Sequence, residues 1–200
     1  MQAQEKTISA QPNQAASEPL LMRWTIEDYH RLVDSGVLAN RQVELINGNL
    51  VEMAPEGAPH SSTTRSGADY LRDRLSGKAM ISEAHPITLS ASEPEPDIAV
   101  VKSPRSQYRD RHPFPKDVFF LIEVSNSTLT YDLTTKRDTY AEANIQEYWV
   151  VDVVTCQIHV FRNLEQGVYT EETIFRTGSI KPLSFPAVAI RVDAFWGVEV

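Results

Sequence analysis

Two carboxylates in the middle of this sequence stand within or beside apolar segments. Glu123 lies inside the apolar run 118–124, and Asp97 directly precedes a second run at 98–101. A short, unbroken apolar run is typical of a strand that is buried on both faces. A carboxylate in such a strand is costly to ionise unless a cation or several hydrogen-bond donors meet it. The two acids are therefore candidate ligands of a divalent metal.

The local sequence indicates how the two acids could meet. Pro94 and Pro96 hold the chain extended before Asp97. If the two strands pair antiparallel, both carboxylates can point to one face and bind Mg²⁺ or Mn²⁺ through oxygen. Each acid also has a purely structural alternative. Asp97 could cap a strand end, and Glu123 could form a buried salt bridge to an arginine or lysine.

A lysine on the next predicted helix is the third candidate. Asp132, Lys136 and Tyr140 follow one another at spacings of four residues, which places them on one helical face. Lys136 could lean over the strand that carries Glu123, orient a water and stabilise charge on a phosphate. The alternative is a surface ion pair between Asp132 and Lys136, which is common and contributes little.

Two further residues have less specific surroundings. Glu44 lies within the segment 43–46, where it could support the site or simply face solvent on a strand. His60 follows a segment rich in proline and glycine, at the start of a predicted helix. It could approach the site, but an exposed position at the helix start is the simpler interpretation.

Bulk properties restrict the class of protein. With 200 residues, the chain is long enough for one domain with a substantial core. The net charge of −8 argues against a surface that is basic throughout. The single Cys156 cannot form an internal disulfide and is expected to be a buried, inert thiol in a reducing compartment. No stretch is apolar enough to span a membrane, so a soluble, cytoplasmic protein is expected.

Periodicity and turn signals predict the elements that must position these side chains. Residues 1–19 lack apolar anchors and are expected to form a flexible tail, followed by one domain at 20–200. Thr25 and Asp28 can cap a helix that ends near Gly36, and Asn47-Gly48 predicts a hairpin. Helices are also expected at 61–76 and 131–143, and strands at 79–90, 97–102, 117–125, 147–153, 157–161, 168–176 and 187–192. This order predicts a mixed α/β (α+β) sheet with helices packed against it.

These motifs, taken together, resemble a known family. The pattern Ile122-Glu123-Val124-Ser125 with Asp132, Lys136 and Tyr140, followed by the segment 147–152, is similar to the Uma-two family of the PD-(D/E)xK restriction-endonuclease-like superfamily. The segments 43–51 and 96–101 resemble that family's N-terminal signature and its metal-acid motif. The resemblance runs from about Trp24 to the C-terminus.

The resemblance implies a restriction-endonuclease-like core, with a central mixed β-sheet flanked by helices. It implies that Asp97 and Glu123 are metal ligands and that Glu44 completes the site. The superfamily's lysine usually stands two residues after the second acid, where this chain has Ser125. The similar family takes its lysine from the following helix, which corresponds to Lys136 here.

One long predicted loop, at residues 102–116, is rich in lysine and arginine. Residues 102–116 contain five lysines and arginines and one acid, Asp110, with aromatic residues between them. Such a loop could contact phosphates and stack on bases. Alternatively, it is a solvated loop whose arginines pair with acids elsewhere in the chain.

The function expected from these observations is a metal-dependent endonuclease that hydrolyses DNA phosphodiester bonds. The alternatives are an inactive nuclease-fold protein that serves as a binding or assembly module, and a phosphoesterase that acts on a smaller substrate. A homodimer is also expected, from the apolar residues at 148–161 and from the family resemblance. The same residues could equally form the internal core of a sheet.

The composition of the N-terminal segment gives a first testable prediction. Deleting residues 1–18 should leave the melting temperature nearly unchanged, because this segment contributes no apolar anchor to the core. Thermal denaturation of the full-length and shortened proteins measures the effect. A large fall in the melting temperature would show that the segment docks on the domain.

Overall fold

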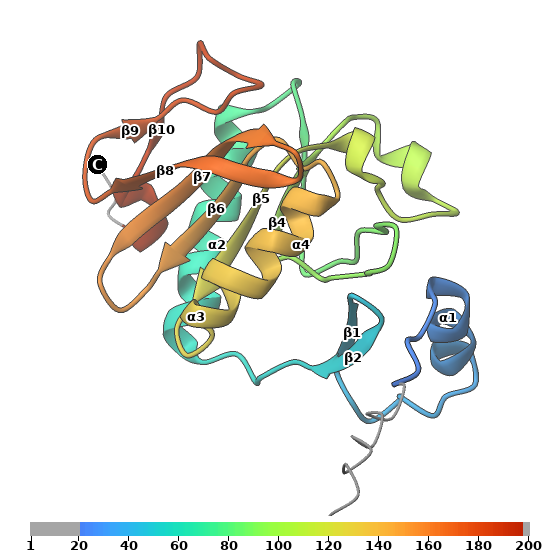
Figure 1. Cartoon of the computed structure of the whole chain (residues 1–200). Coiled ribbons are helices and arrows are strands. Elements are labelled where there is room, and N and C mark those ends of the chain that lie inside the picture. The colour runs from blue at the N-terminus through green and yellow to red at the C-terminus, as the bar shows by residue number, and fades with distance from the viewer. Residues whose placement is uncertain (1–20, 198–200) are drawn as a thin grey trace, which may run out of the picture.

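Six strands form one mixed sheet in the computed structural model, which describes residues 21–197 (Figure 1). The tail expected at 1–19 lies outside these residues. The sheet runs in the order β3-β4-β5-β6-β7-β8. All neighbouring pairs are antiparallel except β5 and β6, which are parallel. The strands are β3 (Met80–Glu83), β4 (Ile98–Val101), β5 (Val118–Ser125), β6 (Tyr148–Asp152), β7 (Gln157–Glu165) and β8 (Val168–Phe175). The predicted mixed sheet is confirmed.

Helices cover both faces of this sheet. On one face, α2 (Ala58–Arg74) and η4 (Asp193–Trp196) pack against alternate residues of β4 to β7, with Phe120 and Trp149 stacked at the centre. On the other face, α4 (Arg137–Glu142) contributes Tyr140, which packs edge-on against Tyr148. Because successive residues of a strand point to opposite faces, strands covered on both sides are apolar throughout. This explains the unbroken apolar runs in the sequence.

The N-terminal elements form a smaller unit beside the sheet (Figure 1). Helix α1 (Ile26–Asp34) begins at the predicted capping box of Thr25 and Asp28. The strands β1 (Val43–Ile46) and β2 (Asn49–Glu52) form the predicted hairpin around Asn47-Gly48. Both turn residues have positive φ, which asparagine and glycine tolerate best. This hairpin brings one acid, Glu44, to the edge of the main domain.

The helix expected at 131–143 is divided into three parts. A short turn, α3 (Leu129–Tyr131), leads into the π-helical segment η3 (Asp132–Lys136), which continues into α4. Segments of π-helix are rare and occur frequently at functional sites. Here the wider turn contains both Asp132 and Lys136, which are buried.

Three details differ from the sequence-based expectations. The strand predicted at 79–90 ends at Glu83, after which Ala84 adopts positive φ. The segment 187–192 does not join the main sheet, because β10 (Ile190–Arg191) pairs with β9 (Ser179–Ile180) in a separate two-stranded sheet. Cys156 is exposed rather than buried, since it occupies a positive-φ position in the turn between β6 and β7.

The apolar segment that suggested a homodimer lies in the interior of the sheet. Strand β6 is buried along its whole length, and β7 is buried from Ile158 to Phe161. The core of one chain therefore accounts for these residues, and the dimer stays a prediction. Within residues 21–197, no helix combines the length and apolar character needed to cross a membrane.

A close contact between α2 and η4 gives a second prediction. A Cβ added at Gly67 would lie 2.5 Å from two ring atoms of Phe195, which is fully buried. Overpacking costs about 1–3 kcal/mol, whereas replacing a helical glycine by alanine returns about 1 kcal/mol. Gly67→Ala should therefore lower the free energy of unfolding in chemical denaturation. The control Ser62→Ala, at an exposed position of the same helix, should leave the free energy of unfolding unchanged. If the two variants are equally stable, the packing argument is refuted.

Candidate metal and phosphodiesterase site

The alternation of β5 directs Glu123 towards the face covered by α4. Leu121 packs in the core on that face, whereas Ile122 and Val124 pack on the opposite face against α2. Glu123 therefore points away from α2 and has only 3% of its surface exposed. Its carboxylate lies at the end of β5 where the parallel neighbour β6 also ends.

Two side chains from the helical segment hold one oxygen of Glu123. The Lys136 Nζ donates to Glu123 Oε1 at 3.0 Å, and the Tyr140 hydroxyl donates to the same atom at 2.6 Å. Lys136 thus reaches Glu123, as predicted, from η3 rather than from the position of Ser125. The alternative interpretation, that Glu123 forms a buried salt bridge, also fits this contact. A lysine that assists catalysis and a lysine that only pairs with Glu123 would both lie at this distance.

Asp97 lies beside Glu123, just before the first paired residue of β4. The antiparallel register of β4 and β5 pairs Ile98 with Ile122, which places the preceding Asp97 close to Glu123. The backbone N–H of Asp97 donates to Glu123 Oε2 at 3.4 Å, and Asp97 Oδ2 accepts from the Val124 N–H at 2.7 Å. Asp97 therefore caps the strand end and also stands next to the second acid.

The N-terminal hairpin supplies the third acid. Glu44 lies on β1 and is only 2% exposed, so the solvent-facing alternative is wrong. Its Oε2 lies 3.1 Å from Lys136 Nζ, and it also accepts from the backbone N–H of Glu95 at 3.3 Å. Lys136 therefore bridges two buried carboxylates that belong to separate parts of the chain. The four predicted site residues Glu44, Asp97, Glu123 and Lys136 all line one pocket.

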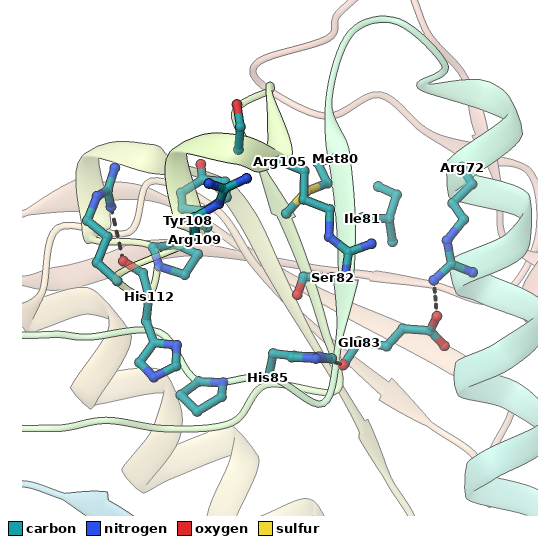
Figure 2. A pocket seen from close by; sticks show the side chains of 14 residues that line it. Arg72, Met80, Ile81, Ser82, Glu83, His85, Arg105, Tyr108, Arg109 and His112 are labelled. Carbon is teal, nitrogen blue, oxygen red and sulfur yellow. Dashed lines mark hydrogen bonds and ion pairs between the residues drawn. The ribbon is translucent and has the colours of Figure 1, made fainter. Parts of the chain in front are cut away.

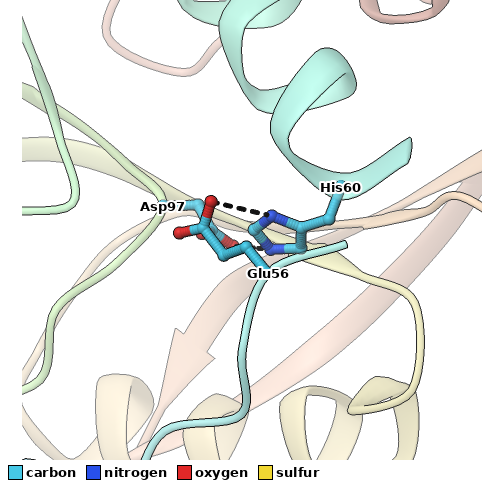
Figure 3. A group of neighbouring side chains, drawn as sticks. All are labelled: Glu56, His60 and Asp97. Atoms are coloured by element: carbon cyan, nitrogen blue, oxygen red, sulfur yellow. Dashed lines mark ion pairs between the residues drawn. The ribbon is translucent and has the colours of Figure 1, made fainter. Parts of the chain in front are cut away.

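His60 was expected to be exposed, and the structure contradicts this. Its side chain is 14% exposed, and its Nε2 lies 3.2 Å from Asp97 Oδ2. Figure 3 shows Glu56 approaching the same two residues, and one ligand atom from each of the three lies within 4.8 Å of the others. One feature of the sequence indicates where His60 lies along the chain. Proline is typical of the first turn of a helix, so Pro59 places His60 in the first turn of α2.

The alternative of a surface ion pair between Asp132 and Lys136 is wrong. Both residues are buried, and Asp132 accepts hydrogen bonds from the hydroxyls of Ser125 and Thr128 at 2.7 and 2.6 Å. Asp132 thus ties the start of the helical segment to the end of β5. Lys136 is left to face Glu44 and Glu123, where the π-helical turn directs it.

The pocket around these residues holds far more negative than positive charge. It has a volume of about 430 Å³. Its cationic or basic side chains are Lys136 and His60, and its carboxylates are Glu44, Glu52, Glu56, Glu95, Asp97, Glu123 and Asp132. In addition, His60 Nδ1 is buried and lies 3.7 Å from Glu56 Oε2, too far for a hydrogen bond. Crowded carboxylate oxygens around an imidazole are a donor set that fits a divalent cation.

Burial and charge shift the acid–base properties of the central pair. Loss of hydration raises the pKa of Glu123 well above its usual value; Lys136 opposes this shift, and the neighbouring acids reinforce it. For Lys136, loss of hydration acts to lower the pKa, but Glu123 and Glu44 outweigh it and raise the pKa. Lys136 is therefore an ammonium group at physiological pH. For His60, desolvation lowers the pKa, but the hydrogen bond to Asp97 and nearby acids raise it overall.

A tyrosine that the sequence did not single out also lines the pocket. The hydroxyl of Tyr131 is buried and has no hydrogen-bond partner among residues 21–197. Loss of hydration raises the pKa of Tyr131 to about 12, so the hydroxyl keeps its proton and is available as a donor. Its position at the end of α3 follows from the helical break that the sequence did not reveal.

Comparison with protein families gives one match that covers most of the chain. The profile of the Uma2 family, described as "Putative restriction endonuclease", matches residues 26–193. This is the family that the motif resemblance indicated. A search of curated proteins found no match.

A solved structure has a similar fold. It is described as a "putative nuclease belonging to DUF820" from Anabaena variabilis ATCC 29413, determined at 1.96 Å resolution. The superposition has a TM-score of 0.68 at 14% sequence identity, and covers 86% of this chain and 97% of the other. At this identity the similarity establishes the fold alone, a mixed sheet covered by helices.

The buried ion pairs give a third prediction. Lys136→Met leaves Glu44 and Glu123 without their cation, so the free energy of unfolding should fall by about 3 kcal/mol or more. A carboxyl group whose pKa is higher in the folded than in the unfolded protein binds its proton more tightly in the folded state. The stability that this group contributes to the protein is therefore lost as the pH rises. The pKa of Glu123 is already raised, and removing Lys136 raises it further. The loss should therefore be larger at pH 8 than at pH 5.

Denaturant titrations at the two pH values measure this loss. The control is Lys116→Met, because Lys116 is exposed. A loss in Lys136→Met that does not depend on pH would contradict the electrostatic account.

Proposed function

We propose that this chain, which belongs to the Uma2 family of restriction-endonuclease-like proteins, is a metal-dependent endonuclease that hydrolyses DNA phosphodiester bonds. The observation that carries the proposal is the cluster formed by Asp97, Glu123 and Lys136. Asp97, directly before β4, contacts Glu123, near the end of β5, through its backbone N–H, and a buried ammonium group contacts Glu123. A purely structural ion pair needs one carboxylate, whereas this pocket gathers seven.

Asp97 and Glu123 are the residues proposed to hold Mg²⁺ or Mn²⁺. Asp97 is common to this pair and to the group it forms with Glu56 and His60, so those two residues offer further donors to the same ion. Imidazole suits transition metals better than Mg²⁺, and a ligand role for His60 would favour Mn²⁺. A bound ion of this kind would polarise a phosphoryl oxygen and lower the pKa of a water molecule.

Lys136 acts through its charge rather than as a base. Its pKa is raised by Glu123 and Glu44, so it cannot accept a proton from water near neutral pH. Its ammonium group is proposed to stabilise the negative charge that grows on the phosphate in the transition state. Glu44 supports this role by fixing the ammonium group from the side of the hairpin.

Tyr140 and Asp132 position the two charged groups. The Tyr140 hydroxyl holds Glu123 Oε1 in place, leaving Oε2 to face Asp97. Asp132 fixes the π-helical segment against β5 through Ser125. Rigid placement of this kind lowers the reorganisation that the reaction requires. A cytoplasmic location, where genomic or invading DNA is accessible, is part of the proposal.

A cleavage assay on supercoiled, linear and single-stranded DNA, with Mg²⁺ or Mn²⁺, tests the function. Asp97→Asn and Glu123→Gln should each reduce the cleavage rate at least about a hundredfold, because one carboxylate cannot hold the ion in place. Lys136→Met should slow cleavage by a similar factor while still binding Mn²⁺, since both proposed ligand carboxylates remain and the role of Lys136 concerns the transition state.

The matched control is Glu52→Gln, which removes an exposed carboxylate of the same pocket. This variant should cleave DNA at the wild-type rate. Absence of cleavage by the wild type under all these conditions, together with unchanged Mn²⁺ affinity in Asp97→Asn and Glu123→Gln, would favour the inactive binding or assembly module.

A further inference from the structure

A second pocket, on the other side of residues 83–85, has the opposite charge. It has a volume of about 740 Å³ and lies between the edge strand β3 and the loop 102–117. Its lining includes one carboxylate, Glu83, and six cationic or titratable basic side chains, which are Arg72, His85, Arg105, Arg109, Arg111 and His112. In a chain with a net charge of −8, such a concentration of cations requires an explanation.

Two of these arginines are already engaged within the protein. Arg72 pairs with Asp69 at 2.7 Å and also with Glu83, the single acid of the pocket (Figure 2). Arg111 pairs with Asp117 at 2.6 Å and lies over the rings of Tyr108 and Phe114. These contacts neutralise Glu83 and Asp117, so these two acids do not pair with the remaining cations of the pocket.

Arg105 and Arg109 are available to a ligand. Both are exposed, and among residues 21–197 neither has a carboxylate within 4.0 Å. They stand at the start of η1 (Arg105–Tyr108) and just beyond its end. A guanidinium group with free N–H donors is suited to bind a phosphate group through two hydrogen bonds.

The loop that carries these arginines is fixed rather than loose. The Tyr108 hydroxyl and the Gln107 side chain both donate to the Lys102 carbonyl oxygen at 2.9 Å. Further along, Asp117 accepts from the Phe114 N–H at 3.0 Å as well as from Arg111. A binding surface that is already ordered loses less conformational entropy when a ligand arrives.

The two pockets share a wall. Glu83 and His85 line the basic pocket, and Ala84 between them lines the acidic one. Ala84 is held by its backbone N–H, which donates to the carbonyl oxygen of Asp97 at 3.2 Å. A polymer with a phosphate at Asp97 and Glu123 could therefore continue across Ala84 and present its next phosphates to Arg105 and Arg109.

We propose that Arg105 and Arg109 form a binding site for the phosphate backbone of DNA, on the flank of the phosphate that is cleaved. This inference rests on the proposed function. It resolves the two alternatives for the loop 102–116 in favour of a phosphate contact. Arg111 pairs with Asp117 and holds the loop in place, while Arg105 and Arg109 contact the substrate. Binding at this site depends on the charge of the phosphates and not on the DNA sequence, because the phosphates are the same at every base.

The test measures binding separately from cleavage. Fluorescence anisotropy with a labelled DNA duplex, in EDTA and at several salt concentrations, reports affinity when no metal is present. Arg105→Ala combined with Arg109→Ala should weaken binding at least about tenfold at low salt, and should reduce the slope of log K against log salt by about 2. The fold should be unaffected, because the two side chains have no partner among the described residues, and thermal melting verifies this.

The matched control is Arg176→Ala. Arg176 is an exposed arginine that directly follows β8, at the opposite edge of the sheet. Its removal should change neither the affinity nor the salt slope. The inference is overturned if the double variant binds as the wild type does, if Arg176→Ala weakens binding equally, or if the wild type does not bind DNA at low salt.

The same experiment separates this inference from the proposed function. Glu123→Gln should bind DNA in EDTA with nearly wild-type affinity while it loses cleavage. If the wild type binds through Arg105 and Arg109 but never cleaves, the binding site stands and the endonuclease proposal fails. If the wild type cleaves and the double variant binds normally, the endonuclease stands and this site fails.

Discussion

The candidate site depends on one buried cation. Lys136 lies between Glu44 and Glu123, at 3.1 and 3.0 Å, and each of the three residues comes from a different part of the chain. Burying a single carboxylate is costly, and burying two without a cation is far more so. The ammonium group therefore joins the N-terminal hairpin, the central strand β5 and the helical segment 129–142 into one site. The π-helical turn and the hydrogen bonds of Asp132 and Tyr140 serve to bring it there.

Charge is divided between the two pockets. Acids surround the strand ends at Asp97 and Glu123, whereas arginines and histidines line the far side of residues 83–85. A polyanionic substrate would be repelled by the acidic pocket alone, unless a divalent cation neutralised it. In the proposed endonuclease, the basic surface next to that pocket would hold the polymer, and a bound metal ion would hold the phosphate that reacts. The net charge of −8 therefore describes the chain as a whole and not the face that is proposed to contact DNA.

Much of the fold could be predicted because its signals are local. Thr25 with Asp28 marks a helix start, Asn47-Gly48 marks a hairpin, and the apolar runs mark strands covered on both faces. The acids Asp97 and Glu123 could be placed together in advance only on the condition that the two strands pair antiparallel, and the structure meets this condition. The resemblance to the family placed Glu44 and Lys136 in the same site, and the structure does bring them together.

The remaining features depend on tertiary packing. His60 has no sequence neighbour that points to Asp97, and it reaches that acid because α2 packs across the sheet. Asp132 and Lys136 have the spacing of a surface ion pair, but a π-helical turn redirects both to buried partners. Cys156 stands in an apolar context, yet a positive-φ turn exposes it.

The central claim is that Asp97 and Glu123 hold a metal ion beside the ammonium group of Lys136. Diffraction from crystals soaked in Mn²⁺ and measured for anomalous scattering tests it most directly. The account predicts one strong anomalous peak within about 2.0–2.4 Å of carboxylate oxygens of both Asp97 and Glu123, and no such peak in crystals of Glu123→Gln. A peak held by Glu56 and His60 without Glu123, or no peak at saturating Mn²⁺, would contradict it.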